Sequence, residues 1–130
     1  MSLLLDTHTF LWWINDDPAL PTSLRAFLEV YPDPIYLSMA SCWEISIKAG
    51  LGKFPGLPTD LERFLNEQLE QNNFQLLPID LSHVARVRDL PTHHRDPFDR
   101  LLIAQAMLEE LTLVSVDDAF SVYTVNVRWA

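Results

Sequence analysis

The sequence predicts an α/β fold, a three-layer α/β/α sandwich in which helices cover both faces of a mostly parallel sheet of four to five strands. Short apolar segments alternate with amphipathic helical segments along the chain, which is typical of parallel strands joined by right-handed helical crossovers. The 130 residues contain no linker rich in Gly, Pro or Ser, so we expect one domain over residues 1–130.

The first half of the chain begins with Leu3–Leu5, which is apolar and too short for a helix and therefore indicates a strand buried on both faces. Helical spacing of apolar residues follows from Thr7 to the Asn15–Pro18 segment, and again over residues 21–30. A second strand is expected at 35–38, before a helix that begins near Ser41 and ends at Gly50. We expect Thr59 to cap the next helix, whose apolar residues are Leu61, Phe64, Leu65 and Leu69.

The second half of the chain contains the clearest helix, residues 97–110, with Asp96 as its cap and Pro97 in its first position. A third strand (75–79) and a helix that includes Val84 and Val87 precede it. A fourth strand (112–116), a helical turn (118–121) and a weak fifth strand (124–127) follow it.

Composition excludes several classes of protein. With 48% hydrophobic and 21% charged residues, the chain can bury a core, which excludes a disordered protein. We expect no membrane segment and no export signal, because no apolar run approaches the roughly 18 residues of a membrane helix and the N-terminus lacks a basic region. The single cysteine, Cys42, permits no internal disulfide, so we expect a cytoplasmic protein.

The formal net charge of −9 argues against nucleic-acid binding unless the acids are concentrated at one place. Asp6 directly follows the first strand, Glu44 lies in the first turn of the helix after the second, and Asp117 directly follows the fourth. Parallel strands present their carboxyl ends at one edge of the sheet, where ligands bind. Asp96 and Asp99 reach that edge if the helix over residues 97–110 begins beside it.

Each acid also has a simpler explanation as part of a helix cap. Ser41 and Glu44 have the spacing of a capping box, Asp96 and Asp99 match a cap with an acid at the third helical position, and Asp6 or Asp117 could cap the next helix. Chance gives no reason for three strands to deliver an acid to one edge, so we favour a shared site.

A shared site of this kind requires a cation. Two carboxylates about 4 Å apart repel by roughly 4 kcal/mol at an effective dielectric constant near 20. The candidate ligands are carboxylate oxygens without neighbouring Cys or paired His, which favours Mg²⁺ or Mn²⁺ over zinc or copper. Such a site is typical of hydrolysis or phosphoryl transfer.

Four segments of this sequence, taken in order, resemble the PIN domain of VapC-type toxins over essentially the whole chain. They are Leu3–His8, Trp43–Ile45, His94–Ala106 and Leu113–Phe120, and the His-x-Asp-Pro-Phe-Asp-Arg motif is the most specific part. The resemblance implies a PIN-like fold and a metal-dependent ribonuclease, with Asp6, Glu44, Asp99 and Asp117 as the catalytic and metal-binding acids.

Two neighbouring acids are alternatives within this resemblance. Asp96 is a second candidate ligand, although we favour Asp99 because Asp96 is better explained as the helix cap. Asp118 is the rival of Asp117, but the family pattern Thr-x-Asp-x-x-Phe fits Asp117, with Ser115 in place of Thr.

The implied reaction is hydrolysis of an RNA phosphodiester bond by a water molecule bound to one or two Mg²⁺ ions, without a covalent intermediate. The resemblance also implies a homodimer and a small antitoxin partner. Without the five acids the net charge is only −4, so composition does not exclude RNA as the substrate.

Basic residues concentrate between positions 83 and 100, and we expect Arg100 and Arg95 to bind the phosphates of RNA. The alternative is a solvated helix face that forms salt bridges. The other basic residues of the segment are His83, Arg86, Arg88, His93 and His94. Outside it, we expect Trp12, Trp13 and Trp43 to pack in the core rather than to stack on bases.

Other functions remain as alternatives. A PIN-like module that binds RNA or protein without catalysis would keep the fold. A magnesium-dependent phosphatase fits less well, because the first strand ends in Asp6-Thr7-His8 rather than Asp-x-Asp. A phosphoacceptor domain would need an acidic pair after the first strand and a lysine after the fifth, and both are absent.

Overall fold

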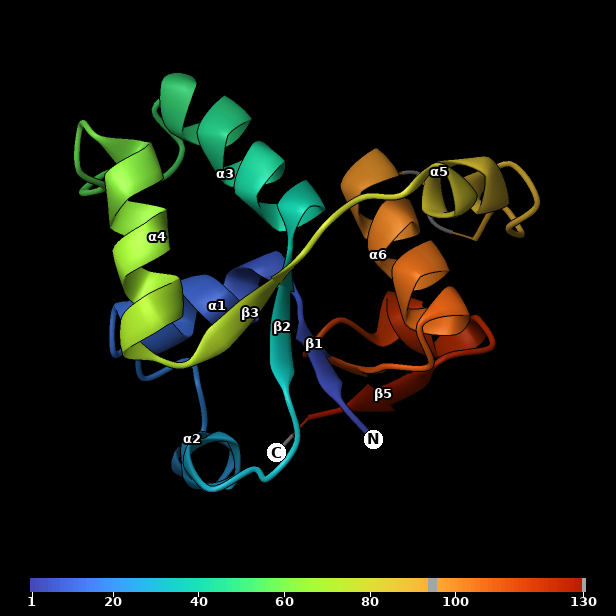
Figure 1. The fold of residues 1–130 in the computed structure, drawn as a ribbon, viewed down its shortest axis with the longest axis horizontal. Coiled ribbons are helices and arrows are strands. Elements are labelled where there is room, and N and C mark those ends of the chain that lie inside the picture. The colour runs from blue at the N-terminus through green and yellow to red at the C-terminus, as the bar shows by residue number, and fades with distance from the viewer. Residues whose placement is uncertain (94–95, 130) are drawn as a thin grey trace.

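The computed structural model describes residues 1–93 and 96–129, which form a sheet of five strands with helices on both faces (Figure 1). The strands lie in the order β3-β2-β1-β4-β5, and every neighbouring pair is parallel. Their bounds are Leu3–Leu5 (β1), Ile35–Ser38 (β2), Phe74–Leu77 (β3), Thr112–Val114 (β4) and Asn126–Arg128 (β5). The predicted α/β class with a mostly parallel sheet is confirmed.

Six α-helices and one 3-10 helix connect the strands in the described part of the chain. The α-helices are Thr7–Ile14 (α1), Thr22–Glu29 (α2), Met39–Gly50 (α3), Leu61–Gln71 (α4), Leu81–Val87 (α5) and Pro97–Leu108 (α6), and the 3-10 helix is Asp118–Val122 (η1). None of the helices in the described ranges has the length and hydropathy needed to cross a bilayer.

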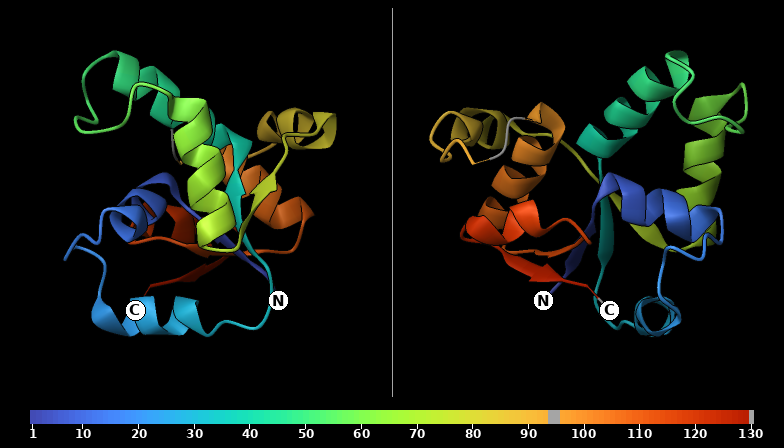
Figure 2. Two further views of the ribbon diagram at one scale, coloured as in Figure 1. Left: turned by 60° about the vertical axis from the view of Figure 1, so that its left-hand side comes forward. Right: turned by 180° about the vertical axis from the view of Figure 1, so that it is seen from behind.

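Two apolar cores lie on opposite faces of the sheet. Leu3 and Leu5 belong to a core that includes residues of α1, α2 and α4, whereas Leu4 belongs to the core around α6. Successive side chains of a strand point to opposite faces, so this division shows helices packed on both sides of β1, as the two views of Figure 2 also show.

The register of the central strands explains where the acids meet. Leu5 of β1 pairs with Leu37 of β2 on one side and with Val114 of β4 on the other. The residues that follow these three positions therefore lie next to one another at one edge of the sheet. They are Asp6, Ser38 and Ser115.

Two helices begin at different residues from those predicted. Helix α3 starts at Met39 rather than near Ser41, because the Ser38 hydroxyl accepts a hydrogen bond from the Ala40 N–H (3.0 Å) and acts as the cap. Helix α4 is capped by Asp60 rather than by Thr59, since the Asp60 carboxylate accepts from the Arg63 N–H (3.2 Å).

Several predicted elements end earlier than expected. Strand β3 stops at Leu77, before Pro78, which has no N–H to continue the ladder. Helix α6 stops at Leu108, because Glu110 adopts a left-handed backbone conformation with φ 55°. Strand β4 ends at Val114 rather than at residue 116. Strand β5 differs in the other direction, because it covers Asn126–Arg128 instead of 124–127.

Candidate active site

A cavity of about 410 Å³ lies at the edge of the sheet where β1 and β4 end. All five acids singled out from the sequence line it, although they come from α3, from the start of α6 and from the ends of β1 and β4. The complete lining is Asp6, Thr7, His8, Trp12, Glu44, Lys48, Asp96, Asp99, Val116, Asp117 and Phe120.

Asp6 caps α1 and lines the cavity at the same time. Its side chain is buried, with an exposed fraction of 6%. One carboxylate oxygen accepts from the Thr9 N–H (2.8 Å), and the other accepts from the Ser115 hydroxyl (2.5 Å). The Ser115 hydroxyl in turn accepts from the Asp117 N–H (3.0 Å), so Ser115 connects the acids at the ends of β1 and β4.

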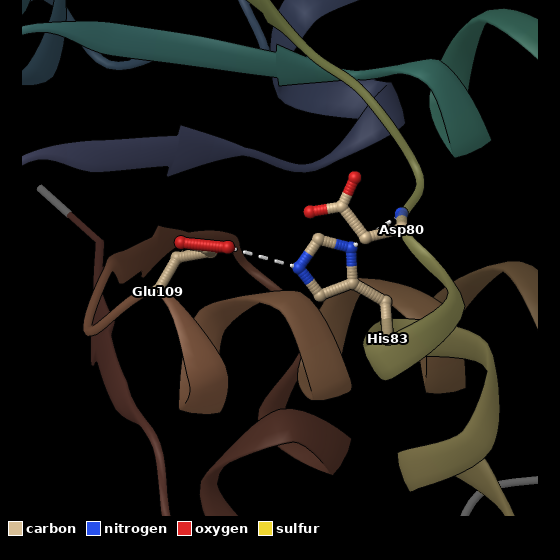
Figure 3. Close-up of side chains that lie close together, drawn as sticks. All are labelled: Asp80, His83 and Glu109. Carbon is tan, nitrogen blue, oxygen red and sulfur yellow. Dashed lines mark hydrogen bonds and ion pairs between the residues drawn. The ribbon is translucent and has the colours of Figure 1, made fainter.

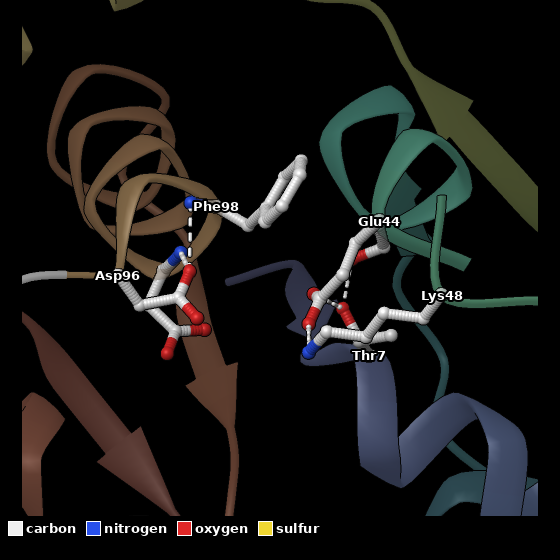
Figure 4. A network of polar contacts seen from close by, with 7 residues as sticks. Thr7, Glu44, Lys48, Asp96 and Phe98 are labelled. Carbon is white, nitrogen blue, oxygen red and sulfur yellow. Dashed lines mark hydrogen bonds and ion pairs between the residues drawn. The ribbon is translucent and has the colours of Figure 1, made fainter. Parts of the chain in front are cut away.

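Glu44 lies in the second turn of α3, with a buried side chain that is only 3% exposed. Its Oε1 accepts from the Thr7 hydroxyl (2.7 Å), and its Oε2 lies 2.5 Å from Nζ of Lys48 (Figure 4). The expected position of Glu44 in the first turn was wrong, and so was the capping box with Ser41. Because Ser38 is the cap, Ser41 is inside the helix, where its hydroxyl lies within hydrogen-bonding distance of the Thr7 hydroxyl (2.9 Å).

Asp96 is the cap of α6, as predicted. One of its carboxylate oxygens accepts from the N–H groups of Phe98 (2.8 Å) and Asp99 (3.1 Å), and Pro97 occupies the first helical position (Figure 4). Asp117 caps η1 in the same way, through the Ala119 N–H (2.9 Å). Helix caps and a shared acidic site are therefore not alternatives here: the helices begin at the same edge, and their caps supply the acids.

The acids of the cavity act electrostatically on one another. The pKa of Asp99 is raised to about 8, chiefly by burial and then by the negative charges of Asp96, Glu44, Asp6 and Asp117. The pKa of Lys48 is raised by its hydrogen bond to Glu44 and by the charges of Glu44, Asp96 and Asp99. The site thus carries more negative charge than its own side chains neutralise.

This donor set fits a hard divalent cation. The cavity is lined by five carboxylates, and His8 is the one imidazole among its described residues. Mg²⁺ and Mn²⁺ prefer carboxylate oxygens, and a cation would relieve the repulsion that raises the pKa of Asp99.

A second group of possible metal ligands lies at α5, away from the cavity. One ligand atom each of Asp80, His83 and Glu109 lies within 4.8 Å of the other two (Figure 3). The His83 Nδ1 accepts from the Asp80 N–H (3.0 Å), which places the ring proton on Nε2, where it is donated to Glu109 (3.1 Å). Both ring nitrogens are occupied, so we interpret this group as a cap of α5 in which the His83 ring is buried and the two acids are exposed.

The basic residues expected near the site have other surroundings. His83 is a fully buried residue of α5. The Arg100 guanidinium donates to three main-chain carbonyls, those of Val87 (2.9 Å), Leu90 (3.3 Å) and Pro91 (2.9 Å). These contacts join α6 to the end of α5, so the structure gives Arg100 a structural function. Arg95 and His94 lie outside the described residues.

The aromatic side chains also differ from expectation in one case. Trp12 and Trp13 pack against the core, as predicted. Trp43 does not, because it lies two residues before Ile45 and so faces away from the core side of α3. It is 56% exposed, and its ring makes an edge contact with Phe98 at a centroid distance of 5.1 Å.

Sequence reasoning missed two residues of the cavity. Lys48 follows Glu44 by four positions, and this spacing on a helix is a signal that could have predicted the ion pair. Thr7 directly follows Asp6, but nothing local indicates that its hydroxyl reaches Glu44, which is 37 positions away in the chain.

Comparison with known proteins identifies the family and the fold of this chain. The family model of the PIN domain matches residues 3–125. A search of curated proteins finds no match. The fold is similar to the crystal structure of VapBC2 from Rickettsia felis bound to a DNA fragment from its promoter, with a TM-score of 0.76 and 19% identity over 100% of both chains.

Two further solved structures have the same fold. FitAcB from Neisseria gonorrhoeae has a TM-score of 0.64 and 24% identity, over 98% of this chain and 96% of that one. A toxin-antitoxin complex from Klebsiella pneumoniae has a TM-score of 0.62 and 16% identity, over 97% of this chain and 95% of that one. The match to the PIN domain model over residues 3–125 argues against the two alternatives, a magnesium-dependent phosphatase and a phosphoacceptor domain. With its parallel sheet, its acid-lined cavity and a match over residues 3–125, the chain belongs to the PIN domain family.

Proposed function

We propose that this PIN domain is a metal-dependent endoribonuclease and the toxin of a toxin-antitoxin pair. The observation that carries the proposal is the cavity in which five carboxylates from distant parts of the chain meet, and in which burial and the charges of the other four raise the pKa of Asp99 to about 8. PIN family membership and the similar fold of chains solved in toxin-antitoxin complexes support it.

In this proposal Asp6, Glu44, Asp99 and Asp117 hold Mg²⁺, or Mn²⁺ in its place, and Asp96 is the alternative ligand. When bound, the cation lowers the pKa of a coordinated water molecule and neutralises charge on the phosphate. The chain's own residues orient the ligands: Thr7 holds Glu44, and Ser115 holds Asp6.

The cation also explains how a chain with a net charge of −9 can bind RNA. Half or more of the net charge belongs to the five acids of the cavity, so a divalent ion bound there weakens the negative field at the point where phosphate must approach. Repulsion elsewhere on the surface is screened beyond about 8 Å at physiological salt.

We further propose a cytoplasmic homodimer that is held inactive by a small antitoxin protein. Support for the antitoxin comes from the toxin-antitoxin complexes among the solved structures of similar fold. Support for additional protein contacts comes from α3, where Met39, Trp43 and Ile47 recur at every fourth position and are 41%, 56% and 41% exposed.

Metal binding is the first property to test, because a failed cleavage assay would reflect an unsuitable RNA as readily as an inactive protein. We would compare the melting temperatures of the wild type, Asp99→Asn and the control Glu70→Gln, each with EDTA and with millimolar Mg²⁺ or Mn²⁺. Glu70 is an exposed acid on α4, away from the cavity.

We expect the metal to raise the melting temperature of the wild type and the control, and to raise that of Asp99→Asn much less. In EDTA near neutral pH, Asp99→Asn should melt above the wild type, because the wild-type carboxyl must take up a proton on folding and asparagine need not. An identical, metal-independent Tm in all three proteins would reject the nuclease site. A metal response without cleavage of any RNA, but with retained RNA binding, would favour the non-catalytic binding module.

A further inference from the structure

Lys48 is the one Lys or Arg among the described residues that line the acid cavity. Its Nζ lies 2.5 Å from Oε2 of Glu44, and its side chain is 27% exposed, so it faces both the buried carboxylate and the open cavity. Figure 4 shows the lysine extended beside Glu44, on the side of the cavity opposite Asp96.

The ion pair has a clear physical cause. Glu44 is 4% exposed in its side chain, and a buried carboxylate needs a positive partner or strong hydrogen bonds. Lysine four positions later on the helix is well placed to provide the charge. The negative charges of Asp96 and Asp99 add to this attraction across the cavity and, with Glu44, raise the pKa of Lys48.

A divalent cation bound by Glu44 would supply the same charge at the same carboxylate. The metal and the ammonium group of Lys48 therefore compete for Glu44, and a bound metal leaves Lys48 with a weaker attraction to its present partner. Lysine carries a compact charge on a flexible stem with three donors, so its amino group can move while its backbone stays within α3.

A phosphate that enters the cavity is the natural second partner for this group. It would bring negative charge next to the acids, where a cation on the protein lowers the repulsion. Arg100 is less suited to this function, because its guanidinium is hydrogen-bonded to main-chain carbonyls of the segment after α5.

We propose that Lys48 is a phosphate-binding residue with two alternative partners: it neutralises Glu44 in the metal-free protein and binds an RNA phosphate when a divalent cation occupies the acids. The inference rests on the proposed function of the same cavity. It identifies Lys48 as a side chain of that cavity that contacts the phosphate backbone of the RNA.

The test compares Lys48→Gln, Lys48→Arg and the control Lys53→Gln. Glutamine removes the charge but keeps a hydrogen-bond donor for Glu44, which protects the fold, and arginine keeps the charge. Lys53 lies beyond the end of α3 and does not line the acid cavity. Two quantities are measured: Mn²⁺ affinity by calorimetry, and binding of a labelled single-stranded RNA in Ca²⁺ at several salt concentrations.

We expect Lys48→Gln to bind Mn²⁺ more tightly than the wild type, because an internal competitor for Glu44 is gone. It should bind RNA more weakly, and the slope of log K against log salt should fall in magnitude by about 0.7, the value for one phosphate contact on a single strand. Lys48→Arg should keep the slope, and Lys53→Gln should match the wild type in both measurements.

An unchanged salt slope in Lys48→Gln, with wild-type protein that binds both Mn²⁺ and RNA, would overturn the role of Lys48 and leave the proposed nuclease intact. Weaker Mn²⁺ binding in Lys48→Gln would also count against it, because that result indicates a lysine that only holds Glu44 in place. Wild-type protein that binds neither metal nor RNA would reject both proposals.

Discussion

At the scale of single residues, the hydroxyl of Ser115 connects two acids of the cavity. It donates to Asp6 and accepts from the Asp117 N–H, and it is 2% exposed. The two acids it connects follow neighbouring parallel strands, so one small side chain sets the distance between them. The family pattern Thr-x-Asp-x-x-Phe has Thr at the position of Ser115, and either residue supplies the hydroxyl.

Replacement of Ser115 tests this function. Ser115→Ala should lower the free energy of unfolding by about 1–3 kcal/mol, because a buried carboxylate and a main-chain N–H lose their partner. It should also weaken the stabilisation by Mn²⁺, while Ser115→Thr should behave as the wild type. Urea denaturation with and without Mn²⁺ measures both effects, and a variant Ser115→Ala with wild-type metal response would show that the hydroxyl does not position the acids.

The raised pKa of Asp99 predicts an unusual dependence of stability on pH. The carboxyl has a pKa of about 8 in the folded protein, against an ordinary value of 3.8. Between these two values the folded state holds a proton that the unfolded chain has released, so this group lowers stability as the pH rises from about 4 to about 8.

Asp99→Asn has no such proton, so its stability in EDTA should fall less than that of the wild type over this pH interval. Urea unfolding at pH 5 and pH 8 gives the comparison, and saturating Mn²⁺ should remove the difference by lowering the pKa of the wild-type carboxyl. If the free energy of unfolding in EDTA depends on pH in the same way in the wild type and in Asp99→Asn, the pKa of Asp99 is not raised in the folded protein.

At the scale of elements, the site depends on how helices begin. Helices α1, α6 and η1 each begin with an aspartate that accepts hydrogen bonds from the first turn. These three helix starts face one cavity, where their N-terminal dipoles also favour negative charge. A carboxylate cluster is therefore stabilised by the ends of the elements before any metal binds.

Arg100 connects two elements, and its replacement should mainly change stability. Arg100→Ala removes three charge-assisted hydrogen bonds to the segment after α5, and we expect the free energy of unfolding to fall by about 2 kcal/mol. Arg100→Lys should recover little, because lysine cannot contact three carbonyls with a planar fork. Equal melting temperatures for Arg100→Ala and the wild type would disprove this role.

A contact between Arg100 and RNA stays a prediction that the same variants can test. If the sequence-based expectation holds, Arg100→Ala binds RNA more weakly and with a flatter salt dependence than the wild type. If the guanidinium only joins α6 to α5, the salt slope is unchanged as long as the variant is folded.

At the scale of the whole molecule, the sandwich places two apolar cores around a sheet whose central strand is buried on both sides. Some apolar surface remains outside these cores, including Trp43 at 56% and Leu51 at 66% exposed. Contiguous patches of exposed apolar side chains, rather than single ones, are typical of surfaces that bind another protein.

The proposed homodimer is tested by the mass of the protein in solution. Light scattering at micromolar concentration should give twice the mass of the chain, and dilution should lower the mean mass if association is weak. The measurement is repeated with Trp43→Ser, which probes the exposed surface of α3 without changing the acids. A monomer mass for the wild type at micromolar concentration would remove the homodimer from the proposal.

The amino-acid sequence by itself determined the features that depend on neighbours in the chain. Leu3–Leu5 is a strand because it is short and apolar, and Asp96-Pro97 begins a helix because the cap and the proline are compatible with its first turn. The placement of Asp6 and Asp117 at one edge followed from the parallel sheet, since parallel strands present their carboxyl ends at the same edge.

Only the tertiary structure decided which side chains meet across long separations. Thr7 with Glu44, Ser115 with Asp6 and Arg100 with the end of α5 are pairs that no local pattern indicates. Helix α3 starts two residues earlier than predicted, at Met39. Each residue of a helix turns by about 100°, so this difference changes the directions in which Glu44, Lys48 and Trp43 point, relative to the sheet, by about 200°. Neighbouring residues in the chain determine where helices and strands form, but the packing of these elements against one another determines which side chain each functional group contacts.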